Sequence, residues 1–297
     1  MTRPIKQIEA DLAMLSATVA TVAEEISSAY GKYFQLLGES VQRQIALASY
    51  QICTQAYPDS FLGLSYNQRQ KLQESLREVG KQVKAHLELV LETSKKVNPA
   101  IAEFDEASSE EETVETAEET NSEQTEEIEE SEESEESEES EEIEESEDLT
   151  PENLIEWIAR LEAAIAEILQ AASSEANRLL QETGILPNKL PNKLLEAAVQ
   201  AEESTEAIGG GQPNLLKLVV ETEAPDSAKD AQVTQLMAVC LRLAEIEFTA
   251  PALSAQRNQI RELQAKVAKL QKQYSQKHRE RSVAQAEAAW RSCWYED

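Results

Sequence analysis

The side chains that most often carry catalysis are few in this chain. Its 297 residues include two histidines, His86 and His278, and three cysteines, Cys53, Cys240 and Cys293. A His-based triad or a metal cluster needs several such groups at defined spacings, and the sequence contains no HExxH, GxSxG, GxGxxG or P-loop motif. The cysteines are odd in number and outside any CxxC, which favours unpaired thiols over disulfides. We expect no catalytic residue, no cofactor and no metal site, and predict a protein that is not an enzyme.

Carboxylates are abundant, but they are concentrated in one place. The chain has 57 Asp and Glu against 27 Lys and Arg, a net charge of −30, and the segment 103–148 holds 26 of the acids with no Lys or Arg. A general acid needs a buried environment that shifts its pKa, which a solvated glutamate run does not provide. From Thr125 the segment repeats X-Glu-Glu, and a period of three builds no common face on a helix. We predict that residues 103–148 form a disordered acidic linker.

The opposite charge gathers near the C-terminus. Between Arg257 and Arg281 there are eight basic and two acidic side chains, a net charge of +6. The densest part offers a candidate polyanion contact, Lys277, Arg279 and Arg281, to which nucleic acid could bind. On a helix the eight bases scatter around the axis, so a solvated helix exterior is the favoured interpretation. The acidic linker could be a spacer or an electrostatic screen for this helix.

Aromatic side chains close the chain. Trp290 and Trp294 lie one helical turn apart with Arg291 between them. Trp and Arg are favoured anchors of protein interfaces, so these three residues form a candidate docking patch. The alternative is that the two indoles pack against a neighbouring helix.

Two apolar seams predict the elements that position these groups. Each seam has steps of three and four residues, the 3.5-residue period of a coiled coil. The candidate interface residues of the first seam are Ile5, Ile8, Leu12, Leu15, Val19, Val22 and Ile26, and those of the second are Leu253, Ile260, Leu263, Val267, Leu270 and Tyr274. Gln256 occupies the polar seam position between Leu253 and Ile260. A narrow seam needs a partner helix to bury it. The two seams can pair with each other or with copies of themselves in a homo-oligomer, and the sequence does not choose.

The remaining pattern is also helical. The first seam broadens into a helix that extends toward Tyr57, with a kink expected near Gly31 or Gly38, and a loop at 58–63 leads to a second helix, capped by Ser65, that ends near residue 98. Thr150, Pro151 and Glu152 form an N-terminal helix signal, and Gly184 is a candidate C-cap.

One short segment has the residue pattern of a β-strand. Residues 215–220 are the only strand-like stretch, and the sequence leaves open whether they are strand or helix. A single strand must pair in an oligomer or join a helix. A helix is expected from about 233 to 248, followed by the helix of the second seam.

Together these observations predict an all-α protein. We expect a helical hairpin at 1–102, the acidic linker at 103–148, a helical region at 149–211 that ends in a glycine linker, and a helical region with a coiled coil at 212–297. No window of 18 apolar residues is present, and Glu9 and Asp11 interrupt any secretory signal, so we expect no transmembrane segment and a cytoplasmic protein. The predicted function is a non-enzymatic coiled-coil adaptor or scaffold that acts through protein partners. The alternative is a nucleic-acid-associated regulator that uses the basic helix and is screened by the acidic linker.

Overall fold

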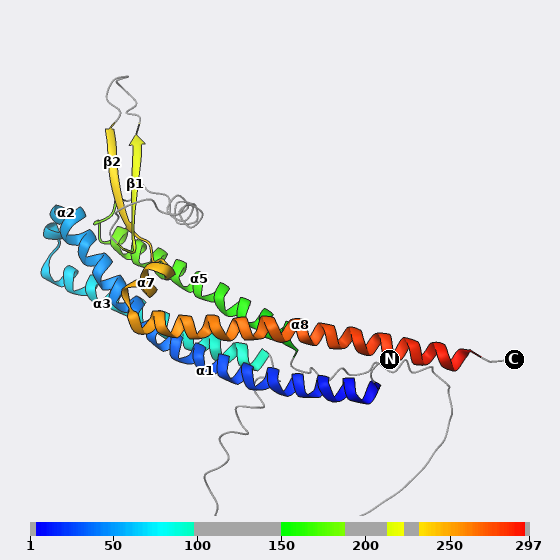
Figure 1. Cartoon of the computed structure of the whole chain (residues 1–297). Coiled ribbons are helices and arrows are strands. Elements are labelled where there is room, and N and C mark those ends of the chain that lie inside the picture. The colour runs from blue at the N-terminus through cyan, green and yellow to red at the C-terminus, as the bar shows by residue number, and fades with distance from the viewer. Residues whose placement is uncertain (1–3, 98–149, 188–212, 223–231, 295–297) are drawn as a thin grey trace, which may run out of the picture.

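The computed structural model describes residues 4–97, 150–187, 213–222 and 232–294. Its described part is built mainly from helices packed lengthwise, as Figure 1 shows. The helices are α1 (Ile5–Gln51), the π-helical turn η1 (Ile52–Ala56), α2 (Pro58–Gly63), α3 (Tyr66–Val97), α5 (Pro151–Glu182), α7 (Leu243–Thr249) and α8 (Pro251–Cys293). The predicted all-α class is confirmed. The acidic linker and the glycine linker lie outside the described residues.

Local signals set the helix ends as the sequence indicated. The Thr150 hydroxyl accepts a hydrogen bond from the backbone N–H of Asn153 at 3.2 Å, with Pro151 as the first helical residue of α5. Gly184 has a φ of +75°, a conformation that costs glycine little, and follows the last turn of α5. Ser65 and Gln68 form a reciprocal capping box before α3.

The N-terminal hairpin is formed by α1 and α3. α1 continues as one helix past Gly31 and Gly38, where the sequence predicted a kink. Gly38 instead allows close contact with α3, because a Cβ atom there would lie 2.9 Å from the Cβ atom of Lys84. Residues 58–63, expected to be a loop, form the short helix α2 between the two long helices.

The two predicted seams pack against each other within one chain. α1 and α8 run antiparallel, as shown by the bond from Gln256 Nε2 to the carbonyl oxygen of Ala29 at 3.3 Å and the ion pair between Lys277 and Asp11 at 3.0 Å. Nine of the candidate seam residues are buried, whereas Ile5, Leu15, Leu270 and Tyr274 are partly buried. The buried ones are Ile8, Leu12, Val19, Val22, Ile26, Leu253, Ile260, Leu263 and Val267.

The main core lies where α3, α5 and α7 join this helix pair. Tyr30 is at its centre, with ring centroids 5.7 Å from Phe34 and 6.1 Å from Trp157, both in edge-on geometry. Trp157 and Leu169 of α5 are buried in this core, whereas Ile168 is only partly buried. One continuous hydrophobic cluster therefore includes side chains from both sides of the acidic linker.

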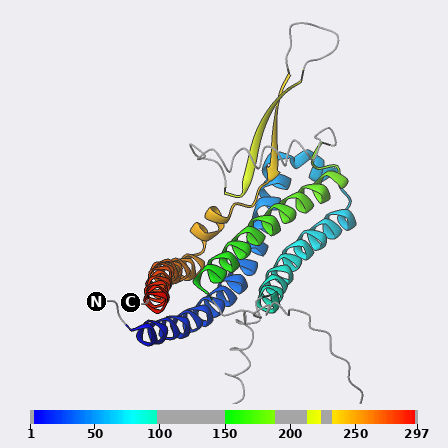
Figure 2. The ribbon, with the colours of Figure 1, turned by 90° about the vertical axis from the view of Figure 1, so that its right-hand side faces the viewer.

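A two-stranded ribbon projects from one end of the packed helices (Figures 1 and 2). β1 (Leu215–Thr222) pairs antiparallel with β2 (Gln232–Val239), with Leu215 opposite Val239. The prediction of a helix from about 233 to 248 is therefore wrong for its first half, which is β2. Within that range the helix is α7. An isolated hairpin is marginal in water, so it needs anchoring at its base. The Asn177 side chain supplies this by pairing with both the N–H and the carbonyl oxygen of Val239, each at 2.8 Å.

Candidate functional site

The chain has two regions with contrasting surroundings. We call residues 5–18 of α1 and 271–293 of α8 the arm, and the rest of the helices the body. The arm holds a small separate core of Ile8, Leu12 and Ala284, with Ile5 and Tyr274 packed against it. Figure 1 shows the two helices of the arm continuing beyond α3 and α5. Each arm helix is thus covered by only one neighbouring helix among the described residues.

A groove follows one side of the arm. It has a volume of about 940 Å³. Its α1 wall repeats at helical spacing of three and four residues, and so does its α8 wall, so the groove follows the helix pair lengthwise. The lining residues are Ile8, Asp11, Met14, Leu15 and Thr18 from α1, and Gln273, Gln276, Lys277, Arg279, Glu280, Val283 and Ala284 from α8.

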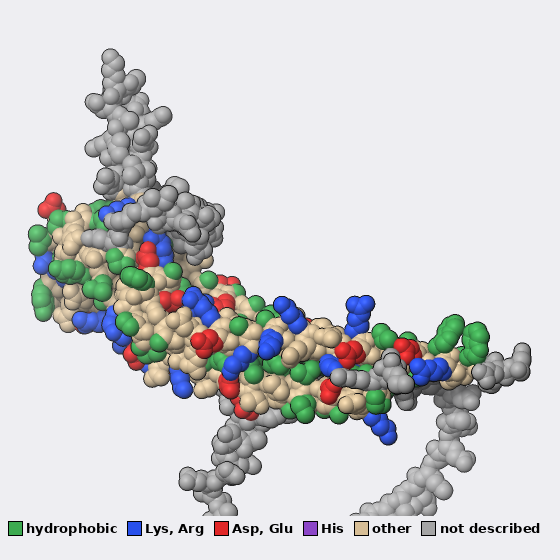
Figure 3. Space-filling model, in the orientation of Figure 1, with side chains coloured by type: hydrophobic (Ala, Val, Ile, Leu, Met, Phe, Trp, Pro, Cys, Tyr) green, Lys and Arg blue, Asp and Glu red, His purple; other side chains and the backbone are tan. Residues whose placement is uncertain are grey.

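Apolar side chains are exposed along this groove. Met14 is 73% exposed and Val283 is 47% exposed, although both belong to helices whose opposite face is packed. Figure 3 shows green side chains along the arm and at its end. The charges near the groove largely neutralise each other, because Lys277 contacts Asp11 at 3.0 Å and Glu280 at 2.9 Å. The groove therefore combines an apolar floor with a rim of balanced charge.

The candidate docking patch lies beyond the groove on α8. Trp290 and Trp294 are 68% and 67% exposed, and their ring centroids are 5.9 Å apart. Arg291 pairs with Glu287 on the same helix at 3.1 Å. The indoles contact each other rather than a neighbouring helix of the described chain, so the packing alternative does not hold for that part. The patch extends the apolar surface of the arm toward the C-terminus.

Of the candidate polyanion residues, Lys277 and Arg279 line the groove, whereas Arg281 is not among its lining residues. Lys277 is partly buried and faces α1, and its hydrogen bonds to Glu280 and Asp11 raise its pKa. Arg279 is exposed, whereas Arg281 is partly buried and contacts His278. Elsewhere on α8, Lys266 pairs with Glu25 at 3.2 Å. The net charge of +6 counted along α8 is thus partly cancelled by acids of α1.

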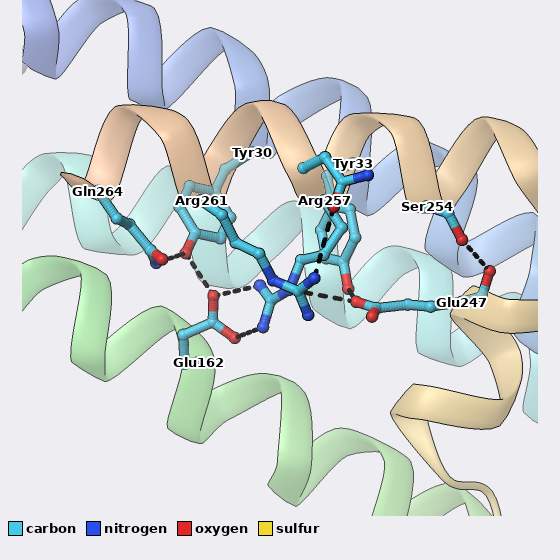
Figure 4. A network of polar contacts seen from close by, with 9 residues as sticks. Tyr30, Tyr33, Glu162, Glu247, Ser254, Arg257, Arg261 and Gln264 are labelled. Carbon is cyan, nitrogen blue, oxygen red and sulfur yellow. Dashed lines mark hydrogen bonds and ion pairs between the residues drawn. The ribbon is translucent and has the colours of Figure 1, made fainter. Parts of the chain in front are cut away.

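The body contains a charged network that the sequence did not reveal (Figure 4). Arg257 of α8 makes two hydrogen bonds to the Glu162 carboxylate of α5, at 2.5 and 2.8 Å, and an ion pair with Glu247 of α7 at 3.3 Å. Tyr30 and Tyr33 of α1 donate to Glu162 and Glu247, each at 2.5 Å. Side chains of α1, α5, α7 and α8 are therefore connected around one guanidinium group.

Burial and pairing shift the pKa values in this network. Burial is the main cause that raises the pKa values of Tyr30 and Tyr33, and the carboxylates that accept their hydrogen bonds raise them further. Burial alone would lower the pKa of Arg257, but the bonds to Glu162 and the nearby charges raise it above its ordinary value. Both tyrosines are thus neutral donors and Arg257 a permanent cation at physiological pH. This arrangement stabilises the fold, since the two carboxylates are held by charge-assisted bonds and face no open groove.

A second polar cluster holds the ribbon to the body. Asn214 has a φ of 59°, a left-handed conformation that Asn tolerates better than most residues. Its side chain donates to Gln44 and accepts from the N–H of Arg242, both at 3.0 Å, and its N–H donates to Glu245. No local pattern marked these residues, because their partners lie far away in the sequence.

The described residues contain no group of three or more His, Cys, Asp or Glu side chains placed to hold a metal ion. Cys53, Cys240 and Cys293 form no disulfide bond with one another; Cys53 and Cys240 are buried, and Cys293 is exposed. None of the described helices is long and apolar enough to cross a membrane.

Comparison with known proteins gives no further assignment. No protein-family model, no curated protein and no solved structure matches this chain.

Proposed function

We propose that this protein is a non-enzymatic adaptor that binds a helix of another protein in the groove of its α1–α8 arm. The observation that carries the proposal is the exposure of Met14 and Val283 on a helix pair that is covered on its other side. Amphipathic helices bind such grooves through apolar side chains spaced three and four residues apart. The α1 wall extends from Ile8 to Thr18, about 15 Å at the rise of a helix, and so fits a partner helix of about three turns.

The proposed partner is a different protein and not a second copy of this chain. The reason to expect a homo-oligomer was that each narrow seam needs a helix to bury it. In this structure the chain provides that helix itself, because the α1 seam packs against the α8 seam. The groove and the Trp290–Trp294 patch stay exposed. These surfaces fit an amphipathic partner helix, whose apolar face would lie in the groove and whose polar face would remain in solvent. We propose the cytosol as the place of action, where free thiols such as that of Cys293 persist.

The nucleic-acid alternative has weaker support. Polyanion binding requires several cations on one face, whereas Lys266 and Lys277 are paired with acids of α1 and Arg257 is enclosed in the body. An electrophoretic mobility assay at low salt serves as a control for the proposal. A shift that weakens steeply as salt is added would support nucleic-acid binding instead.

A site-specific photo-crosslinker tests the adaptor proposal. The reactive amino acid replaces Met14 or Val283 in the full chain, and a third version carries it at Ala17, which is exposed on α1 outside the groove. We expect the two groove positions to yield the same heterologous protein in cells, and Ala17 to yield little or none of it.

A second variant separates binding from folding. Met14→Glu combined with Val283→Glu places charge in the groove at exposed positions, so helicity by circular dichroism should stay unchanged while recovery of the crosslinked protein falls about tenfold or more. Equal crosslinking from Ala17 and Met14, or a product consisting only of two copies of this chain, would refute the proposal.

A further inference from the structure

A second cavity lies inside the N-terminal hairpin, away from the arm. It has a volume of about 370 Å³, within the range of small-molecule sites. It lies between the end of α1 with η1 on one side and α3 on the other, next to α2. The lining residues are Gln42, Ala46, Ser49, Tyr50, Cys53 and Thr54 from α1 and η1, Phe61 from α2, and Leu72, Gln73, Leu76 and Arg77 from α3.

The hairpin itself explains why space is left here. Gly80 brings α3 close to α1, since a Cβ atom there would lie 2.9 Å from Cγ of Gln42. Between that contact and α2, the side chains of α1 with η1 and those of α3 line the two sides of the cavity. α2 is held next to the cavity by Arg69, whose Nε donates to the carbonyl oxygen of Phe61 at 3.1 Å and whose guanidinium stacks on the Phe61 ring at 5.3 Å. The cavity is therefore framed by fixed elements.

One wall group of the cavity lacks the hydrogen bond that its chemistry requires. Ser49 is only 5% exposed, and its hydroxyl has no hydrogen-bond partner. The hydroxyl of Thr54, in the adjoining turn η1, has a local partner, because it donates to the carbonyl oxygen of Tyr50 at 2.7 Å. A buried hydroxyl without a partner costs about 1–3 kcal/mol. The Ser49 hydroxyl is thus available for a group that enters the cavity.

The other buried wall groups are uncharged. Leu72 and Leu76 are buried on the α3 side, and Cys53 lies one helical turn after Ser49. Burial raises the pKa of Cys53 to about 11, so its thiol is protonated at neutral pH and is a poor nucleophile. The inner walls therefore favour a neutral ligand held without a covalent bond.

We infer that this cavity binds a small, neutral, largely apolar molecule that carries one hydrogen-bonding oxygen, such as a phenol or an alcohol, which pairs with the Ser49 hydroxyl. The apolar part of the ligand lies against Leu72, Leu76 and Phe61. The site is independent of the arm, because none of its lining residues belongs to the groove there.

A pair of matched probes tests this site in the full-length protein. 4-Ethylphenol and ethylbenzene differ by one hydroxyl group, and their binding can be followed by ligand-observed NMR titration. We expect saturable binding of both, with 4-ethylphenol about fivefold tighter because one hydrogen bond is gained. Ser49→Ala should remove that preference while leaving the affinity for ethylbenzene almost unchanged.

A filled cavity provides the control for location. Ala46 is exposed at the cavity wall, so Ala46→Phe should block both probes, whereas Ala17→Phe on the arm should affect neither. Circular dichroism of each variant confirms that the helices remain. The inference is overturned if neither probe binds saturably, if Ala46→Phe leaves both affinities unchanged, or if the preference for 4-ethylphenol survives in Ser49→Ala.

Discussion

The body and the arm use the same two helices in different surroundings. In the body, α1 and α8 are also packed against α3, α5 and α7, and the aromatic core around Tyr30 lies beside the Arg257 network. In the arm, the same helices pack only against each other within the described part of the chain, with a small core of Ile8, Leu12 and Ala284. A continuous helix can thus carry a stable end and a weakly held end. Segments with few buried contacts open locally at low free-energy cost, which suits a binding surface.

The strongest test of the body is the loss of its central cation. Arg257→Met would leave the carboxylates of Glu162 and Glu247 without their cation in a site where Arg257 is 15% and Glu247 12% exposed. We expect the free energy of unfolding to fall by about 3 kcal/mol, measured by urea denaturation at pH 7. Lys266→Met is the matched control, because its pair with Glu25 is solvent-exposed and should contribute less than about 1 kcal/mol. Equal losses in the two variants would mean that the network is not a structural centre.

A matched pair of cavity mutations compares the two regions directly. Ile260 in the body and Ile8 in the arm are both buried seam residues of the same type. Ile260→Ala should lower the global free energy of unfolding by about 3 kcal/mol. Ile8→Ala should leave the global value nearly unchanged and accelerate amide hydrogen exchange within 5–18 and 271–293, because the arm opens by itself. Global destabilisation of similar size by both variants would contradict the division into body and arm.

Alkaline pH gives a smaller effect that is confined to the body. The folded-state pKa of Tyr30 is raised above the ordinary value of 10.0, so its contribution to stability is complete below pH 10 and is lost as pH rises further. Above pH 10 the tyrosine ionises in the unfolded chain first, which costs the fold about 1.4 kcal/mol per pH unit. Tyr30→Phe should make the fall of unfolding free energy between pH 10 and 11 smaller by about 1 kcal/mol, because the unfolded tyrosine is only half ionised at pH 10. Tyr66→Phe, at a position 77% exposed, should leave the slope unchanged.

Much of the helical architecture could be predicted from local patterns. The caps at Thr150 and Ser65 and the two seams depend on residues within a few positions of one another, which is the range over which helix signals act. The ribbon shows where this reasoning fails. Residues 232–239 carry apolar side chains compatible with a helix, and they form a strand because β1 pairs with them and Asn177 holds the end of that pair.

Some features of the candidate sites could be predicted from the sequence, and others could not. The exposed Trp290–Trp294 patch and the partly buried position of Lys277 follow from helical spacing combined with pairing to α1. The groove residues Met14 and Val283 and the cavity residue Ser49 carried no distinguishing signal in the sequence. Their importance comes from exposure or from a missing hydrogen bond, and both are properties of the packed structure.

The sequence by itself determined that the chain is helical, where most of its long helices begin and end, and that its negative charge is concentrated in 103–148. Helix periodicity, capping and charge are local properties, so they can be read residue by residue. Only the tertiary structure decided that the α1 seam pairs with the α8 seam, that Arg257 joins Glu162 and Glu247, and that the arm and the hairpin leave a groove and a cavity. The physical reason is that these features depend on contacts between separate helices, such as Arg257 with Glu162 and Gln256 with Ala29, or on the shape of packed helices, which no local pattern encodes.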